Sequence, residues 1–136
     1  YNQNANDKGV MCSGLTMTRR YLTIQEAAST LRRGKSVEVF IGGFKHDNQK
    51  CIRWASFVAK NENVTGSLWE AFDQGSEDYL DIYTFDSPNG EYDEPVKVVT
   101  SINIESAASD LGIKDLNFVN QCMVQDEYAT YLKSHT

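Results

Sequence analysis

The sequence predicts an α+β fold, in which an antiparallel sheet of about five to six strands carries two to three helices packed mainly on one face. Helical spacing of apolar residues occurs early in the chain and again in its last third, and segments that alternate apolar and polar residues lie between. These segments arrive in hairpin-sized pieces rather than in repeated strand–helix–strand units. The 136 residues fit one domain. We assign it to residues 17–136 and treat residues 1–16 as a flexible N-terminal segment or as residues foreign to the natural protein.

The first helix is predicted from a capping box that begins at Thr23 and ends at Glu26. In such a box each of the two side chains accepts a hydrogen bond from the backbone amide of the other residue. Apolar residues at helical spacing continue to Leu31, and Gly34 provides a left-handed stop. A helix from about residue 24 to residue 33 follows.

After this helix the apolar pattern changes to a period of two, which is typical of strands. Alternation predicts strands at residues 37–41, 51–60, 68–72, 79–85 and 96–102. The first two should form one hairpin and the next two a second hairpin. A helical pattern returns at Asn103 and stops at Gly112, and it is followed by a short strand within 118–124 and a short amphipathic helix at 126–133.

Charge is divided unevenly along the chain. Residues 1–60 carry ten bases and four acids (+6), whereas residues 61–136 carry three bases and fifteen acids (−12), which together give the net charge of −6. The thirty-six residues 61–96 contain ten acids and no Lys or Arg. A surface of one sign accelerates association with an oppositely charged protein and repels polyanions. The charge pattern therefore predicts a basic protein partner and no nucleic acid.

Cysteine and histidine usage indicates neither a disulfide framework nor a structural metal site. The three cysteines, Cys12, Cys51 and Cys122, are widely spaced, and the only histidines are His46 and His135. We therefore expect buried, unpaired thiols and a cytoplasmic protein without cofactor or metal. The apolar runs are too short to span a membrane.

A secreted protein is the alternative to the cytoplasmic one. The chain begins at Tyr1 rather than at a methionine, so a cleaved signal peptide could have preceded it. In that case Asn63–Thr65 would be a glycosylation sequon.

The acids of the region 61–96 could in principle form a catalytic pair or a metal site. Glu70 and Asp81 could face each other across the predicted second hairpin, as a glycosidase requires, but a solvated polar face explains them better. Asp73, Glu77, Asp78 and Asp81 crowd a turn without the spacing of a calcium loop. We therefore predict no catalytic residue and no metal ligand.

Aromatic residues set among these acids are typical of a protein-binding surface. The turn 73–78 and the loop 86–95, which carries four acids around Tyr92, are the places where such a surface should be exposed. The predicted partner-binding residues are Trp69, Glu70, Asp73, Glu77, Asp78, Tyr79, Asp81, Asp86, Glu91, Tyr92, Asp93 and Glu94.

The acidic region also carries a family resemblance. The run WEAFDQG at 69–75, the run DYLDIYTF at 78–85, and the opening helix that ends in Gly34 and Lys35 together resemble immunity proteins of bacterial polymorphic-toxin and contact-dependent growth inhibition systems. The resemblance spans roughly residues 22–132. It implies a cytoplasmic, non-enzymatic protein that binds a cognate toxin, commonly a basic nuclease, and blocks it.

We therefore expect a small acidic binding protein that neutralises a basic partner, in the manner of an immunity protein. The main alternative is a small enzyme or ligand-binding domain with a pocket between sheet and helices, lined by Trp54, Phe57 and Tyr83. A third hypothesis is an acidic mimic of nucleic acid that blocks several nucleic-acid-binding proteins.

Overall fold

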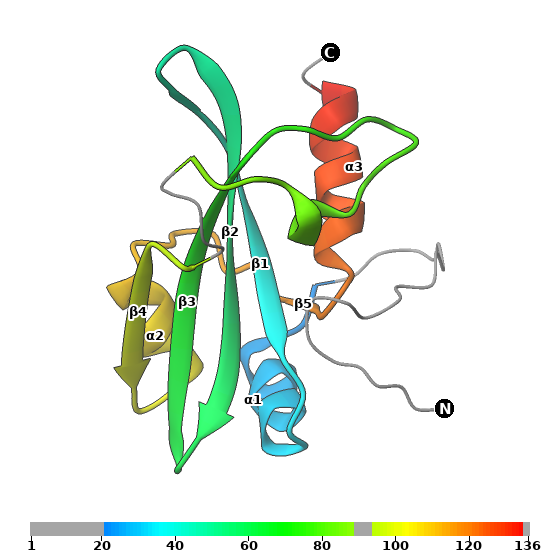
Figure 1. Cartoon of the computed structure of the whole chain (residues 1–136). Coiled ribbons are helices and arrows are strands. Elements are labelled where there is room, and N and C mark those ends of the chain that lie inside the picture. Colours follow the sequence, from blue (N-terminus) through cyan, green and yellow to red (C-terminus); the bar gives the residue numbers. More distant parts are fainter. Residues whose placement is uncertain (1–20, 89–93, 135–136) are drawn as a thin grey trace.

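The computed structural model of the chain describes residues 21–88 and 94–134. These residues form a five-stranded antiparallel sheet and three α-helices (Figure 1), which confirms the predicted α+β fold. The elements are α1 (Ile24–Arg32), β1 (Val37–His46), β2 (Gln49–Lys60), β3 (Asn63–Phe72), the 3-10 helix η1 (Ile82–Thr84), β4 (Lys97–Ser101), α2 (Ile104–Asp110), β5 (Val119–Asn120) and α3 (Val124–Ser134). The strand order is β4-β3-β2-β1-β5.

Two tight turns connect the three long strands. Asp47 and Asn48 join β1 to β2, and Asn61 and Glu62 join β2 to β3; all four have a positive φ, between 51° and 70°. Two-residue turns in this left-handed conformation match the twist of antiparallel strands. The predicted first hairpin is therefore confirmed, and β3 is added to it directly.

The predicted second hairpin is wrong. β3 pairs with β2 along its whole length and with β4 from Val64 to Leu68, and residues 79–85 do not pair with its remaining residues. Residues 79–85 instead leave the sheet and contain η1, and Ile82, Tyr83 and Phe85 are all buried. Their apolar side chains are removed from water because they pack onto the sheet, although the backbone of these residues does not form a strand of it.

The predicted capping box of α1 forms, and α2 also begins at a side-chain cap. In α1, Thr23 Oγ1 accepts from the amide of Glu26 at 3.1 Å, and Glu26 Oε1 accepts from the amide of Thr23 at 2.9 Å. In α2, the side chain of Asn103 accepts from the amide of Ser106 at 2.8 Å. Side-chain caps of this kind satisfy backbone donors that the helix itself leaves unpaired, and so fix where each helix begins.

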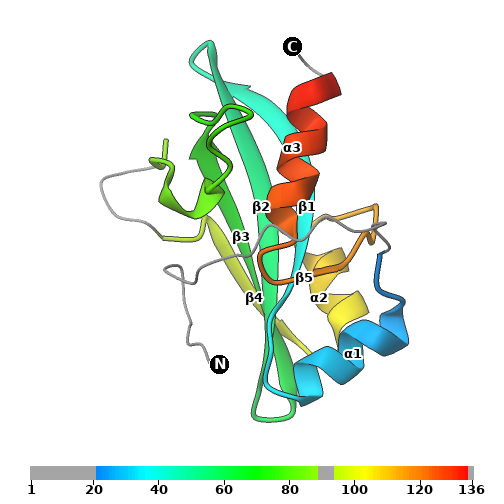
Figure 2. The same cartoon turned by 90° about the vertical axis from the view of Figure 1, so that its right-hand side faces the viewer.

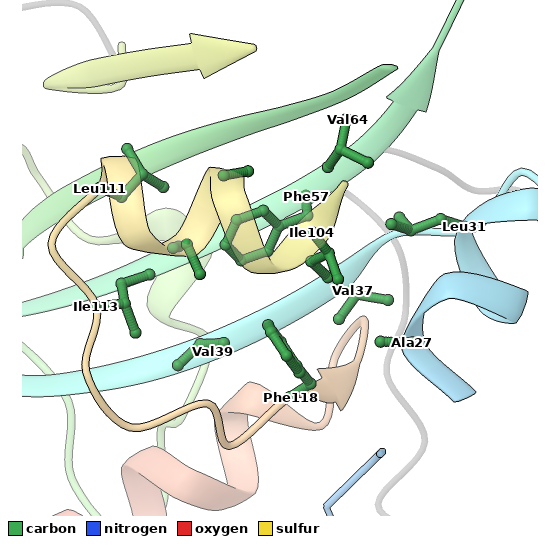
Figure 3. Packing of buried hydrophobic residues seen from close by; sticks show 13 residues of the cluster. Ala27, Leu31, Val37, Val39, Phe57, Val64, Ile104, Leu111, Ile113 and Phe118 are labelled. Atoms are coloured by element: carbon green, nitrogen blue, oxygen red, sulfur yellow. The ribbon is translucent and has the colours of Figure 1, made fainter. Parts of the chain in front are cut away.

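The sheet has two covered faces, because alternate residues of a strand point in opposite directions. Val37 and Val39 of β1 and Phe57 of β2 pack with α1 and α2 (Figure 3). Phe40 and Trp54 point to the opposite face and pack with η1 and α3. Two of the three helices thus share one face, as predicted. Figure 2 shows α1 and α2 on one side of the sheet and the segment that follows β3 on the other.

The described residues include no helix that is both long and apolar enough to cross a membrane. Three of the predicted binding residues, Glu91, Tyr92 and Asp93, lie outside the described residues, as does the predicted N-terminal segment 1–16.

Candidate functional site

The candidate site is residues 73–88, which we call the acidic segment. It leaves the end of β3, crosses the second face of the sheet and contains η1 (Figures 1 and 2). Although it has little regular secondary structure, side-chain hydrogen bonds hold it at its start, its middle and its end. These three attachments determine which of its acids are available to a partner.

Tyr128 of α3 holds the start of the segment. Its hydroxyl donates to Asp73 Oδ1 and accepts from the amide of Gly75 at 3.1 Å, and the Tyr128 side chain is fully buried. The amide of Asp73 also donates to the carbonyl of Lys50 at 2.9 Å. Burial, and then the Asp73 carboxylate, raise the pKa of Tyr128, so its hydroxyl keeps its proton and remains a donor.

Hydrogen bonds between Gln74 and Asp86 join the two ends of the segment. The side chain of Gln74 donates to Asp86 Oδ2 at 3.1 Å and accepts from the Asp86 amide at 2.8 Å. The carbonyl of Asp86 accepts from the amide of Phe72, the last residue of β3, at 2.8 Å. The segment is therefore a closed loop whose ends lie side by side.

The middle of the segment is attached through a buried carboxyl group that we had not predicted. Tyr83 of η1 donates to Glu38 Oε1 at 2.6 Å, and the amide of Cys122, just before α3, lies 3.3 Å from the same oxygen and 3.2 Å from the Tyr83 hydroxyl. Glu38 is only 3% exposed. Alternation between Val37 and Val39 places Glu38 on the face that an antiparallel sheet commonly leaves to solvent, so no sequence signal indicated its burial.

Burial dominates the electrostatics of Glu38. Removal from water raises the pKa of this carboxyl from 4.5 to about 7, although the hydrogen bonds from Tyr83 and from the Cys122 amide oppose the shift. Burial, followed by the neighbouring Glu38 charge, also raises the pKa of Tyr83. Near neutral pH, Glu38 is therefore present in both protonated and ionised forms.

The predicted binding acids fall into two groups. Asp73 is bonded to Tyr128, and Asp81 accepts from the side chain of Gln125 at 3.2 Å, so both help to hold the segment in place. Glu77 and Asp78 are exposed at the turn. Asp86 and Glu94 are also exposed, although Asp86 is engaged with Gln74 as described above.

Tyr79 completes the turn, which we call the tip of the acidic segment and define as Glu77, Asp78 and Tyr79. Tyr79 is 47% exposed, its ring lies against Phe85 with centroids 5.9 Å apart, and its hydroxyl is hydrogen-bonded to Thr84. The tip thus combines two exposed carboxylates with a supported aromatic side chain.

Trp69 and Glu70 are neighbours in β3 and consequently face opposite sides of the sheet. Trp69 stacks on Trp54, with centroids 6.3 Å apart, and donates to Ser56 at 3.1 Å. Glu70 pairs with Arg53 and lies on the face opposite the acidic segment. The structure therefore does not bring Glu70 to the same surface as the tip.

The residues suggested for a pocket do not come together. Trp54 and Tyr83 belong to the buried cluster on one face, and Phe57 belongs to the cluster on the other. A hollow of about 320 Å³ lies elsewhere, beside α1 and β5, lined by Leu22, Gln25, Glu26, Ser29, Thr30, Arg33 and Asn120. In residues 21–88 and 94–134, no group of three or more potential metal-ligating side chains occurs.

The cysteines differ in state. Cys51 is free and buried, as expected, whereas Cys122 is disulfide-bonded, so the prediction of unpaired thiols is wrong for Cys122. Cys12 lies outside the described residues.

Comparison with protein-family models, with curated proteins and with solved structures gave no match.

Proposed function

We propose that this protein is a small acidic binding protein that neutralises a basic protein partner through the tip of the acidic segment. The observation that carries the proposal is the combination, at Glu77, Asp78 and Tyr79, of exposed carboxylates and an exposed aromatic ring on a backbone held to α3. A surface that is ordered before binding loses less conformational entropy when the partner arrives.

The charged and aromatic residues of the tip have different roles. Glu77 and Asp78 steer a basic surface toward the tip, which increases the association rate and makes it sensitive to salt. Tyr79 is the anchor, because aromatic side chains in the centre of an interface contribute much of the binding free energy. Its contact with Phe85 limits the number of positions that the ring can adopt.

A bacterial toxin is the class of partner that we propose, with a basic nuclease as the first candidate. Immunity proteins of this kind bind their toxin and block its active site or an adjacent surface. The disulfide of Cys122 favours an oxidising compartment over the cytoplasm. We therefore place the encounter with the partner in that compartment rather than in the cytoplasm.

Affinity capture with matched variants tests the proposal. The wild-type protein, the tip variant Glu77→Lys/Asp78→Lys and the control variant Glu62→Lys/Glu105→Lys are used to capture partners from the native host. The control carries the same change in net charge at two exposed positions away from the tip. Glu62 lies in the β2–β3 turn at the opposite end of the sheet (Figure 1), and Glu105 lies in α2, which packs on the other face of the sheet. A basic protein should be retained by the wild type and the control, and lost by the tip variant.

Binding measurements on the captured partner then separate steering from anchoring. Tyr79→Ala should weaken binding by on the order of 2 kcal/mol, mainly through faster dissociation, whereas Glu77→Gln/Asp78→Gln should slow association, most strongly at low salt. Failure to recover any basic protein, or full retention by the tip variant, would overturn the proposal.

A further inference from the structure

Glu38 is the point where three separate parts of the fold meet. It belongs to β1, Tyr83 belongs to the acidic segment, and the amide of Cys122 belongs to the turn that leads into α3. The three groups lie within 2.6 to 3.3 Å of one another. A change in the charge of this carboxyl group therefore affects two contacts at once: the hydrogen bond to Tyr83 of the acidic segment and the hydrogen bond to the turn before α3.

We propose that Glu38 is a proton-operated latch for the acidic segment. With its carboxyl protonated, Glu38 holds Tyr83 and η1 against the sheet. Loss of the proton places a negative charge in this closed site, and the site then opens to admit water, which loosens η1 and the residues around it.

The surroundings of Glu38 give little compensation for a negative charge. Its partners across the neighbouring strands are Ser56 on β2 and Val119 on β5, which carry no charge. From the acidic segment, the titratable Tyr83 contacts Glu38 directly, and the charge of Asp81 acts on the Tyr83 hydroxyl. The two hydrogen-bond donors are both neutral, so burial outweighs them and holds the pKa of Glu38 near 7.

The direction of the switch follows from this pKa. Below about pH 6 the carboxyl is protonated and the segment is closed; above about pH 8 it is ionised and the segment is loosened. The attachment of Tyr128 at the start of the segment does not depend on Glu38, so the tip stays tethered while η1 moves. The latch is a property of the isolated protein and does not require that the proposed basic partner exists.

Tryptophan fluorescence can report the opening directly. The chain has two tryptophans, Trp54 and Trp69, and they stack on each other. Trp54 is 6% exposed and meets the ring of Tyr83 edge-on, with centroids 6.2 Å apart. Movement of Tyr83 away from the sheet therefore exposes Trp54 to a soluble quencher such as acrylamide.

The experiment compares acrylamide quenching from pH 5.5 to 8.5 in the wild type and in Glu38→Gln, which can accept the same two hydrogen bonds but does not ionise. The quenching constant of the wild type should rise about twofold with a midpoint near pH 7, and that of Glu38→Gln should stay at the low value. Tyr83→Phe, which lacks the donor, should be readily quenched already at pH 5.5. A flat wild-type profile, or the same transition in Glu38→Gln, would overturn the latch.

If a variant fails to fold, as judged by circular dichroism, a second measurement on the wild-type protein tests the latch. Wild-type protein labelled with ¹³C at glutamate carboxyl groups is titrated by NMR, and the Glu38 resonance is followed. Titration near pH 7, accompanied by shifts of the amides of η1, supports the latch. Titration near pH 4.5, or titration near pH 7 without any change in η1, refutes it.

Discussion

Arg53 on β2 and Glu70 on β3 stand directly opposite each other in the sheet and form a two-point ion pair. Arg53 Nε and Nη2 lie 2.9 Å and 2.7 Å from Glu70 Oε2, and the guanidinium also rests 4.1 Å from the centre of the Phe44 ring. The Glu70 side chain is only 15% exposed. Within the acid-rich region 61–96, this carboxylate serves the stability of the sheet.

Removal of this carboxylate should destabilise the fold. Glu70→Ala takes away the anion that Arg53 bonds in a partly screened site, so we expect a loss of about 1 to 2 kcal/mol in the free energy of unfolding. Urea denaturation of Glu70→Ala, Arg53→Ala and the double variant measures the coupling between the two. The exposed Glu77→Ala is the control and should change stability by less than about 0.5 kcal/mol. Strictly additive single effects would contradict the pairing.

Glu38 should make the stability of the protein depend on pH. The folded-state pKa of about 7 lies above the ordinary 4.5, so the contribution of the protonated carboxyl is fully present below pH 4.5 and is lost as the pH rises through 7. Between pH 5 and pH 8 the wild type should lose on the order of 3 kcal/mol relative to Glu38→Gln. Denaturant unfolding of both proteins at several pH values measures this difference. Parallel pH profiles would show that Glu38 is not the responsible group.

Tyr128 should be important for the order of the acidic segment. Tyr128→Phe keeps the buried ring but removes the hydroxyl that bonds Asp73 and Gly75, at an expected cost of about 1 to 3 kcal/mol. Hydrogen exchange of the Gly75 amide should accelerate, because that amide loses its acceptor. Tyr79→Phe is the matched control. It removes a hydroxyl that is exposed, so it should leave the free energy of unfolding nearly unchanged. Unchanged exchange at Gly75 in Tyr128→Phe would contradict the predicted anchor.

The cysteines should differ sharply in reactivity. Cys51 is fully buried, and burial raises the pKa of its thiol, so alkylation by iodoacetamide should require denaturant. Cys122 should be alkylated only after reduction, because it is in a disulfide. Peptide mapping by mass spectrometry with and without denaturant and reductant distinguishes these states. Labelling of Cys122 in denaturant alone would show that its disulfide is absent.

Local signals predicted most of the elements. The cap of α1 and the turn between β1 and β2 were predictable because each depends on hydrogen bonds or backbone conformations within a few residues. The alternating pattern of β1, β2 and β4 was equally readable, since a strand with a buried face repeats every two residues. The tip residues Glu77 and Asp78 were correctly expected to be exposed.

The amino-acid sequence alone was therefore enough to predict the α+β class, the capped first helix and the charge of the second half of the chain. The path of residues 79–85 became clear only from the folded structure, in which Ile82, Tyr83 and Phe85 are buried in one cluster with Trp54 of β2 and Tyr128 of α3. The tertiary structure also decided that Glu70 pairs with Arg53 and that Glu38 is buried beneath Tyr83. Each of these outcomes depends on partners distant in the sequence, and the environment of a carboxyl group is set by what packs over it rather than by its neighbours in the chain.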